Sequence, residues 1–272
     1  MKSFFKKRGA RLGQHLLTSK DIAREVAEAV GVSEGDTVLE VGPGKGMLTR
    51  ELLRVGARVI AVEKDSSMVE ILEGEFASAI EVGTLTLVEG DARTVLAAHS
   101  SVLTAPYKVV ANIPYYITGE LIRLFLTAPV QPTAVSLLVQ KEVAERIARS
   151  AKESLLSLSV KAYGTPRYVR TVYAGSFNPP PSVDSAILAI EHVSRTHFND
   201  CREEFFFTLL HWGFGQKRKT LFGNLKRANV DATLLKEVFA ELHLDATVRA
   251  EDVPLATWLA LTNKLDGARA VQ

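Results

Sequence analysis

Residues 37–46 read Thr-Val-Leu-Glu-Val-Gly-Pro-Gly-Lys-Gly, and this stretch decides the fold. Its first half, residues 37–41, is rich in β-branched and apolar residues, which is typical of a short buried strand. Three glycines follow within residues 42–46, and apolar residues then recur at helical spacing through residues 47–55. Glycines between a strand and a helix let the backbone approach a ligand at the positive end of that helix. The stretch therefore predicts the first unit of a ligand-binding α/β domain.

Strand-like and helix-like segments continue to alternate through the first two-thirds of the chain. Strands rich in Val, Ile and Leu that alternate with helices favour right-handed crossovers and a mostly parallel sheet covered on both faces. The fold class is therefore a doubly wound α/β domain. We expect strands at residues 37–41, 58–62, 85–88, 108–111, 133–139, 168–172 and 186–190, and helices at 19–30, 47–55, 66–76, around 121–125 and at 142–149.

The strand pattern stops after His192. Four amphipathic segments follow, and all of them have helical spacing. We therefore expect a catalytic domain over residues 1–192 and a small all-helical domain over residues 193–272. The four expected helices span residues 203–212, 221–228, 234–242 and 255–265.

The composition is that of an ordinary globular protein, with 47% hydrophobic and 24% charged residues among 272. Its formal net charge of +2 creates no strong overall field, so any basic surface must be local. Cys201 is the only cysteine, which excludes a disulfide framework and a paired-cysteine zinc site. Prolines and polar residues interrupt the longest uncharged stretch, residues 124–140, so we expect no membrane span. We also expect no metal site. The single cysteine is consistent with a reducing compartment, so we expect a cytosolic location.

Polar residues follow the expected strands, at the sheet edge where such folds bind ligands. The glycine spacing, Gly-x-Gly-x-Gly from Gly42, matches neither a phosphate loop nor the dinucleotide fingerprint. Glu63 lies about 20 residues further on, at a position where a carboxylate accepts hydrogen bonds from the ribose hydroxyls of NAD or of S-adenosylmethionine. Asp91 is placed either to contact an adenine amino group or to cap the next helix.

The tetrad Asn112-Ile-Pro-Tyr115 is the most specific feature of the sequence. An exocyclic adenine amine is a poor nucleophile, because its lone pair is delocalised into the ring. Donation of its two N–H groups to the Asn112 side chain and to a main-chain carbonyl of the tetrad would draw the nitrogen towards tetrahedral geometry. Pro114 fixes the turn, and Tyr115 supplies a ring on which an extruded base can stack. The alternative is a simple turn in which Asn and Pro have only a structural role.

Together with these residues, motifs along nearly the whole chain resemble the KsgA-type rRNA adenine dimethyltransferases. This family usually has Asn-Phe where the chain has His15-Leu16, and many members have Asn in place of Tyr116. The motifs that carry the resemblance are residues 13–17, 40–49, 63, 90–92, 112–115, 140–144, 177–185 and 217–221.

The resemblance implies a Rossmann-like methyltransferase domain and S-adenosylmethionine as cofactor. It implies N6,N6-dimethylation of two adjacent adenosines near the 3′ end of small-subunit rRNA, and a role in small-subunit biogenesis. Phe177 matches a position that packs against the target adenine opposite Tyr115, although a core phenylalanine is the alternative. The implied cofactor contacts are His15, Leu17, Gly42, Gly44, Glu63, Asp91 and Asn112, and the implied catalytic residues are Asn112, Pro114, Tyr115 and Phe177.

Two basic segments without acidic residues are candidates for phosphate contact, one at residues 1–20 and one at residues 215–228. The expected partner is small-subunit rRNA or a pre-assembled small ribosomal subunit, bound by a monomer. The candidate RNA-binding residues are Lys6, Lys7, Arg8, Arg11, Arg146, Lys217, Arg218, Lys219 and Lys226.

Three other functions remain open from the sequence. The chain is also similar to large-subunit rRNA adenine methyltransferases of the antibiotic-resistance type, although residues 216–220 and the proline-rich loop favour the small-subunit group. A non-catalytic RNA-binding assembly or transcription factor could have the same fold. A nicotinamide dehydrogenase is disfavoured by the glycine spacing and by the tetrad.

Overall fold

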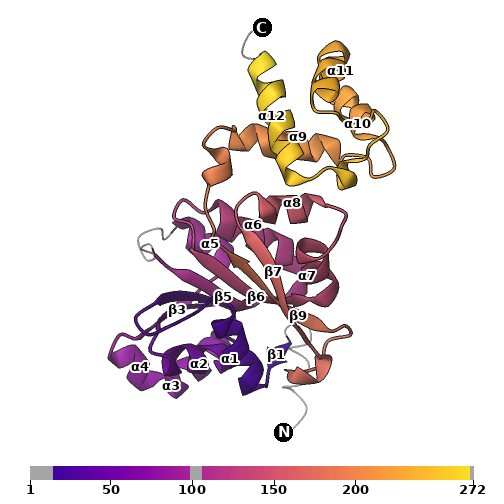
Figure 1. The fold of residues 1–272 in the computed structure, drawn as a ribbon. Helices are drawn as coiled ribbons and strands as arrows, with labels where there is room; N and C mark the ends of the chain where they lie inside the picture. The colour runs from indigo at the N-terminus through magenta and orange to yellow at the C-terminus, as the bar shows by residue number, and fades with distance from the viewer. Residues whose placement is uncertain (1–14, 99–105, 270–272) are drawn as a thin grey trace. The chain divides into compact units, whose positions relative to one another are not determined.

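The computed structural model describes residues 15–98 and 106–269. The chain forms two compact units: residues 1–145 with 165–193, and residues 146–164 with 194–272. The predicted α/β fold with a helical C-terminal part is confirmed (Figure 1). The predicted boundary after residue 192 placed residues 146–164 in the first domain, whereas here they group with the helical unit, because the chain enters that unit twice.

A seven-stranded sheet forms the centre of the first unit, in the order β4-β3-β2-β5-β6-β9-β7. The five strands from β4 to β6 are parallel, whereas β9 is antiparallel to both of its neighbours. The strands span Thr37–Val41 (β2), Arg58–Glu63 (β3), Leu85–Glu89 (β4), Lys108–Asn112 (β5), Ala134–Gln140 (β6), Thr165–Val172 (β7) and Ser185–Glu191 (β9).

Helices cover both faces of this sheet, as expected for a doubly wound fold (Figure 1). Helices α1 and α2 pack against each other on one face, while α5 and α6 lie on the other. Ser19 caps α1, and its hydroxyl accepts a hydrogen bond from the backbone N–H of Ile22. The helices span Lys20–Glu28 (α1), Met47–Arg54 (α2), Ser66–Glu75 (α3), Ala77–Glu81 (α4), Ala92–Ala98 (α5), Thr118–Thr127 (α6) and Lys141–Ala148 (α7).

The central strands are buried on both faces, which explains their mostly apolar sequences. Six of the seven residues of β6 are buried, and so are six of the seven residues of β9. The edge strand β7 is only partly buried and accommodates Pro166, a residue that central strands exclude. The strand begins at Thr165, three residues before the predicted 168–172, and a register shift between Tyr168 and Arg170 interrupts its alternation.

A second, two-stranded sheet joins β1 (Leu16–Leu17) to β8 (Phe177–Asn178). The sequence pattern did not predict it, because two residues are too few to show a period. Short 3-10 helices flank these segments at Tyr115–Ile117 (η2) and Ala174–Ser176 (η3). The pairing ties the start of the described chain to the segment before the proline-rich loop.

The helical unit has its own hydrophobic core, in which Trp258 is completely buried. Leu158 and Ala162 of α8 belong to this core, which is the physical reason that residues 146–164 group with the C-terminal helices. No helix within the described ranges is long and apolar enough to cross a membrane. The unit contains α8 (Leu155–Lys161), η4 (Thr196–Phe198), α9 (Glu203–Gly213), α10 (Leu221–Arg227), α11 (Ala232–Glu241), η5 (Ala250–Asp252) and α12 (Leu255–Arg269).

Candidate functional site

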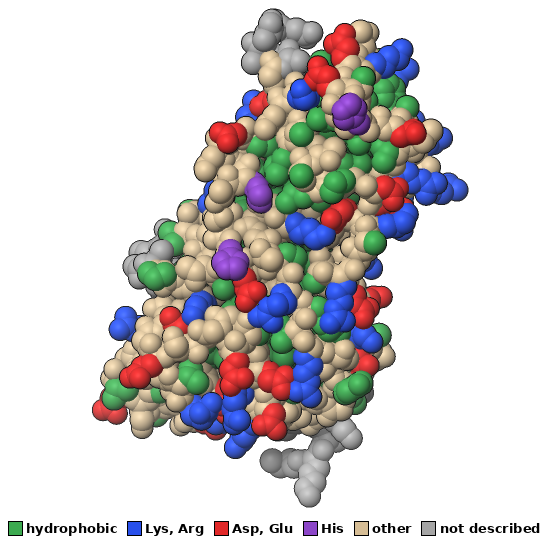
Figure 2. Space-filling view, in the orientation of Figure 1, with side chains coloured by type: hydrophobic (Ala, Val, Ile, Leu, Met, Phe, Trp, Pro, Cys, Tyr) green, Lys and Arg blue, Asp and Glu red, His purple; other side chains and the backbone are tan. Residues whose placement is uncertain are grey.

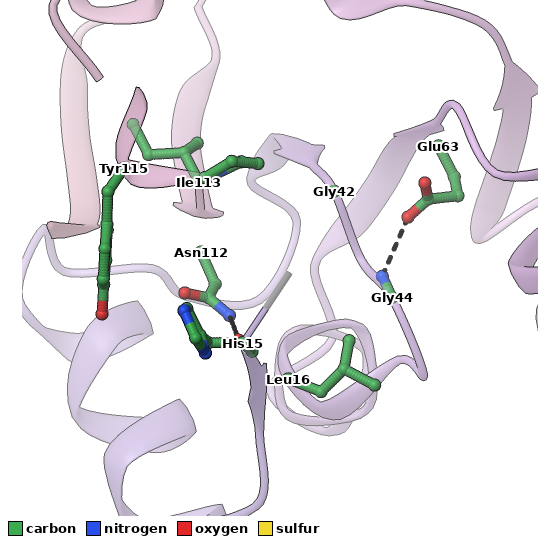
Figure 3. Close-up of a pocket in the computed structure, with 9 residues that line it drawn as sticks. His15, Leu16, Gly42, Gly44, Glu63, Asn112, Ile113 and Tyr115 are labelled. Atoms are coloured by element: carbon green, nitrogen blue, oxygen red, sulfur yellow. Dashed lines mark hydrogen bonds between the residues drawn. The ribbon is translucent and has the colours of Figure 1, made fainter. Parts of the chain in front are cut away.

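A pocket lies at the carboxyl ends of β2 and β5, where the strand order of the parallel sheet reverses. Open α/β sheets bind ligands at such a switch point, because the loops of the two central strands diverge there. Figure 3 shows the pocket between the glycine loop, the tetrad and the segment before β1. Its lining residues are His15, Leu16, Gly42, Gly44, Glu63, Asn112, Ile113, Pro114 and Tyr115.

The glycine loop passes close to its neighbours in a conformation that favours glycine. Gly42 and Gly44 have φ angles of 70° and 57°, both in the left-handed region. A Cβ atom on Gly44 would lie 2.7 Å from the Leu16 side chain, and one on Gly42 would contact the backbone oxygen of Asn112. The glycines therefore keep this part of the pocket open and bring main-chain atoms to its wall.

Glu63 ends β3 and is held in the pocket wall by three backbone N–H groups. Its Oε2 accepts from Gly44 N at 3.1 Å, and its Oε1 accepts from the N–H groups of Lys64 and Asp65 at 2.8 and 2.9 Å. The side chain is almost fully buried. The carboxylate is therefore fixed in orientation, and it couples the glycine loop to the end of β3 (Figure 3).

Glu40 lies on β2 behind the glycine loop and is completely buried. Its Oε2 accepts a hydrogen bond of 2.7 Å from the Thr49 hydroxyl, whereas its Oε1 has no partner within the described residues. Burial in the sheet raises the pKa of Glu40 to about 8. The first turn of α2 is thereby attached to the strand that precedes the glycine loop.

Asp91 follows β4 and is engaged by basic side chains. Arg93 contacts both carboxylate oxygens, at 2.6 and 2.8 Å, and Lys64 Nζ lies 3.0 Å from Oδ2. The Arg93 guanidinium, together with Lys64, holds the pKa of Asp91 well below its usual range. The backbone N–H of Arg93 also donates to Asp91, so the side chain caps the start of α5 as the alternative prediction proposed. Asp91 does not line the pocket at the switch point.

Asn112 ends β5 with its carboxamide in a defined orientation. Its Nδ2 donates to the main-chain oxygen of His15 at 2.9 Å. This bond uses one N–H of Nδ2 and fixes the orientation of the carboxamide, so that Oδ1 points towards Tyr115 (Figure 3). The site thus presents a hydrogen-bond acceptor beside an aromatic ring.

Tyr115 is held on two sides. Its hydroxyl lies 2.6 Å from Ser185 Oγ, and burial raises the pKa of Tyr115. The His15 ring stacks against it with a centroid distance of 5.6 Å. His15 Nδ1 is 2.9 Å from the carbonyl oxygen of Pro179, so the nitrogen carries the proton in this hydrogen bond. The tyrosine ring is therefore positioned between the start of β9 and His15.

Besides Asp91, two further predicted site residues lie outside the pocket. Leu17 and Phe177 are paired across β1 and β8, and both side chains are buried in the core of the first unit. The buried position of Phe177 fits the alternative of a core phenylalanine, and its contact with the target adenine stays a prediction. Sequence reasoning also missed Leu16, whose position between the predicted contacts His15 and Leu17 was the available signal.

The predicted RNA-binding residues fall into two groups. Lys6, Lys7, Arg8 and Arg11 lie outside the described residues. In the helical unit, the predicted cations are all exposed to solvent, and those after α9 form a continuous basic run before α10. The exposed residues are Arg146, Lys217, Arg218, Lys219 and Lys226.

A family model described as Ribosomal RNA adenine dimethylase matches residues 5–266. The chain belongs to this family. Proteins named Ribosomal RNA small subunit methyltransferase A share 37% identity over 252 residues in Dehalococcoides mccartyi strain BAV1 and 38% over 261 residues in Deinococcus radiodurans. The alignments cover 92% and 95% of this chain, and 86% of each relative.

Solved structures agree with the family assignment. A dimethyladenosine transferase from Plasmodium falciparum superposes with a TM-score of 0.77 at 27% identity, covering 93% of this chain and 98% of that one. The 23S rRNA methyltransferase ErmE has a TM-score of 0.71 at 22% identity, covering 92% of this chain and 99% of that one, which shows a shared fold. Membership of the dimethylase family confirms the predicted fold class, the predicted enzyme class and S-adenosylmethionine as the methyl donor.

Proposed function

We propose that this family member transfers methyl groups to N6 of two adjacent adenosines near the 3′ end of small-subunit rRNA, as part of small-subunit biogenesis. The observation that carries the proposal is the fixed Asn112 carboxamide, whose Oδ1 faces the pocket beside Tyr115. The proteins named Ribosomal RNA small subunit methyltransferase A support the choice of substrate.

The residues present fit S-adenosylmethionine at the switch point. The glycine loop offers a close backbone approach, and Oε2 of the fixed Glu63 carboxylate, which has one backbone donor, can accept a further hydrogen bond from a ribose hydroxyl. When bound, the cofactor supplies an electrophilic methyl group on a sulfonium sulfur. Leu17 contributes to the site through its backbone, because its side chain is in the core. The set proposed to hold the cofactor is His15, Leu17, Gly42, Gly44, Glu63, Asp91 and Asn112.

The tetrad residues orient the target amine. Asn112 Oδ1 accepts one N–H of the adenine amine, and a main-chain oxygen at Ile113 or Pro114 accepts the other. Both contacts draw the nitrogen towards tetrahedral geometry and direct its lone pair at the methyl carbon. Because these contacts strengthen as the amine changes shape, they stabilise the transition state more than the bound substrate. Tyr115 stacks on the base and keeps it out of the RNA helix.

The exposed cations of the helical unit are proposed to follow the RNA backbone. Lys217–Lys219, Lys226 and Arg146 are exposed, and phosphate contacts of this kind set affinity and register without reading sequence. The basic segment before His15 is proposed to extend this contact. We further propose that the protein acts as a monomer in the cytosol on an assembled or nearly assembled small subunit.

The test is methylation of ribosomal subunits from cells that lack this protein. Purified small and large subunits are incubated separately with labelled S-adenosylmethionine, and the product nucleosides are analysed by mass spectrometry. We expect dimethyladenosine in small-subunit rRNA only. Labelling confined to the large subunit would support the antibiotic-resistance type of activity, and no labelling of either subunit would support a non-catalytic RNA-binding role.

A further inference from the structure

Two tyrosines of the first unit, Tyr116 and Tyr173, are mostly exposed to solvent. Tyr116 has 72% and Tyr173 has 70% of its surface accessible, and Val183 has 41%. Single exposed apolar residues need no explanation, but two exposed aromatic residues that each follow a neighbour of Ser185 do. Among the described residues, the other exposed large apolar side chains are Ile71 and Val82, which belong to the region of α3 and α4.

All three residues are close in sequence to Ser185 or to a residue that contacts or pairs with it. Tyr116 directly follows Tyr115, whose hydroxyl contacts Ser185 Oγ. Tyr173 directly follows Val172, which pairs with Ser185 across β7 and β9. Val183 precedes Ser185 by two positions. We call Tyr116, Tyr173 and Val183 the aromatic rim.

The rim adjoins the pocket at Tyr116, the residue after the pocket residue Tyr115. Asp184 joins its parts, because its Oδ1 accepts from the backbone N–H of Ala174 at 3.1 Å and its main-chain oxygen accepts from Lys141 at 3.0 Å. Tyr115 belongs to the pocket lining, and Tyr116 is the next residue in η2. An RNA strand that places one base against Tyr115 therefore brings its neighbouring nucleotides towards the rim.

We propose that the aromatic rim stacks on the unpaired nucleotides that flank the target adenosine. This inference rests on the proposed function and specifies how its substrate is held. Extrusion of one base removes a stacking partner from its neighbours, and exposed aromatic rings replace such partners for any base. This contact does not depend on the RNA sequence, so the rim selects RNA in which the flanking nucleotides are unpaired.

The charges around the rim favour contact with bases over contact with phosphates. Lys141 is paired with Glu145 at 4.0 Å, and Glu142 and Asp184 add negative charge beside it. Lys and Arg side chains are interspersed with Asp and Glu on the face shown in Figure 2. Stacking on the rim therefore contributes affinity with little dependence on salt, unlike the exposed cations of the helical unit.

The experiment compares Tyr116→Ala, Tyr116→Leu and Tyr116→Phe, with the same three changes at Tyr173. Methylation of small subunits that lack dimethyladenosine gives KM and kcat, and Ile71→Ala is the control for loss of an exposed apolar side chain elsewhere. We expect each Ala and Leu variant to raise KM by about tenfold, with cofactor affinity unchanged, because each loses one base–aromatic contact. The Phe variants retain the wild-type KM, since the ring remains.

A second measurement tests stacking without catalysis. A short labelled unpaired RNA is compared with the same RNA in which the nucleotides next to the adenosine pair are abasic. If the rim stacks on those bases, Tyr116→Ala weakens binding of the first RNA and leaves binding of the abasic RNA unchanged. Equal effects on both RNAs, or full activity in the Leu variants, would overturn the inference and indicate apolar contact with a ribosomal protein. Wild-type binding without methylation would instead refute the proposed function alone.

Discussion

Removal of the Asn112 side chain separates a role in methyl transfer from a role in cofactor binding. Asn112→Ala deletes Oδ1, the proposed acceptor for the adenine amine, and Nδ2, which donates to the His15 carbonyl oxygen at 2.9 Å. The first loss acts on the transition state, because the amine contact strengthens as the nitrogen becomes tetrahedral. The second acts on the position of the segment before β1. The two effects differ in size and in the quantity that reports them.

The structure allows both magnitudes to be set. Loss of one partly buried hydrogen bond lowers the free energy of unfolding by about 0.5–1.5 kcal/mol, which is small beside the stability of a typical domain. Loss of a positioned dipole at the reacting group slows catalysis by about 10²–10³, as measured for donors that stabilise an oxyanion. A folded Asn112→Ala variant with a strongly reduced transfer rate is therefore expected.

The assay is single-turnover methyl transfer to small subunits, with cofactor affinity measured separately by calorimetry. We expect the rate to fall by two to three orders of magnitude, about 10²–10³, while cofactor affinity changes less than tenfold or about 1.4 kcal/mol. Asn263→Ala, an exposed asparagine of α12, is the matched control and retains wild-type values. Equal losses of rate and cofactor affinity would refute the role assigned to Asn112.

The remaining predictions concern charge, protonation and packing. Replacement of Lys217–Lys219 by alanine flattens the salt dependence of RNA binding, and an unchanged slope would remove these residues from the interface. Glu63→Gln raises the cofactor Kd by about 10–100-fold, because one amide cannot accept from all three backbone donors; calorimetry measures it, and an unchanged Kd would contradict it. Folding raises the pKa of Glu40 from 4.5 to about 8, so the free energy of unfolding falls as the pH rises between these values. Glu40→Gln is expected to remove this fall, and urea unfolding across the pH range measures it. Trp258→Ala is expected to lower the free energy of unfolding by about 3–5 kcal/mol, because it empties a fully buried site, and urea unfolding measures this change.

The main features of the fold could be predicted because their physical causes act over short stretches of sequence. Parallel strands buried on both faces require mostly apolar sequences, and β3 and β5 have uninterrupted apolar centres, whereas Glu40 interrupts β2 and Ser136 interrupts β6. Helix α8 was missed although it has a local signature, a capping box in which Ser154 and Ser157 bond each other's backbone N–H groups. The assignment of this helix to the second unit depends on tertiary contacts of Leu158, which no period in the sequence reports.

Part of the site could be predicted for a similar reason, and part could not. Residues at the ends of strands β2, β3 and β5 converge because the sheet is parallel, so Gly42, Glu63 and Asn112 were found from their positions alone. The inward turn of Phe177 depends on a pairing between segments 160 residues apart, and a two-residue strand leaves no pattern. The exposure of Tyr116 likewise depends on which face of η2 is covered.

The contact between Asn112 and His15 also explains how the family pattern can change at residues 15 and 16. Asn112 donates to the main-chain oxygen of His15, an atom that every amino acid supplies. The side chain at that position is therefore free to take another role, and here the imidazole stacks on Tyr115 and bonds the Pro179 carbonyl. Because the pairing of β1 with β8 holds the backbone in place, substitution at His15 should disturb the tyrosine ring before it disturbs the orientation of the carboxamide.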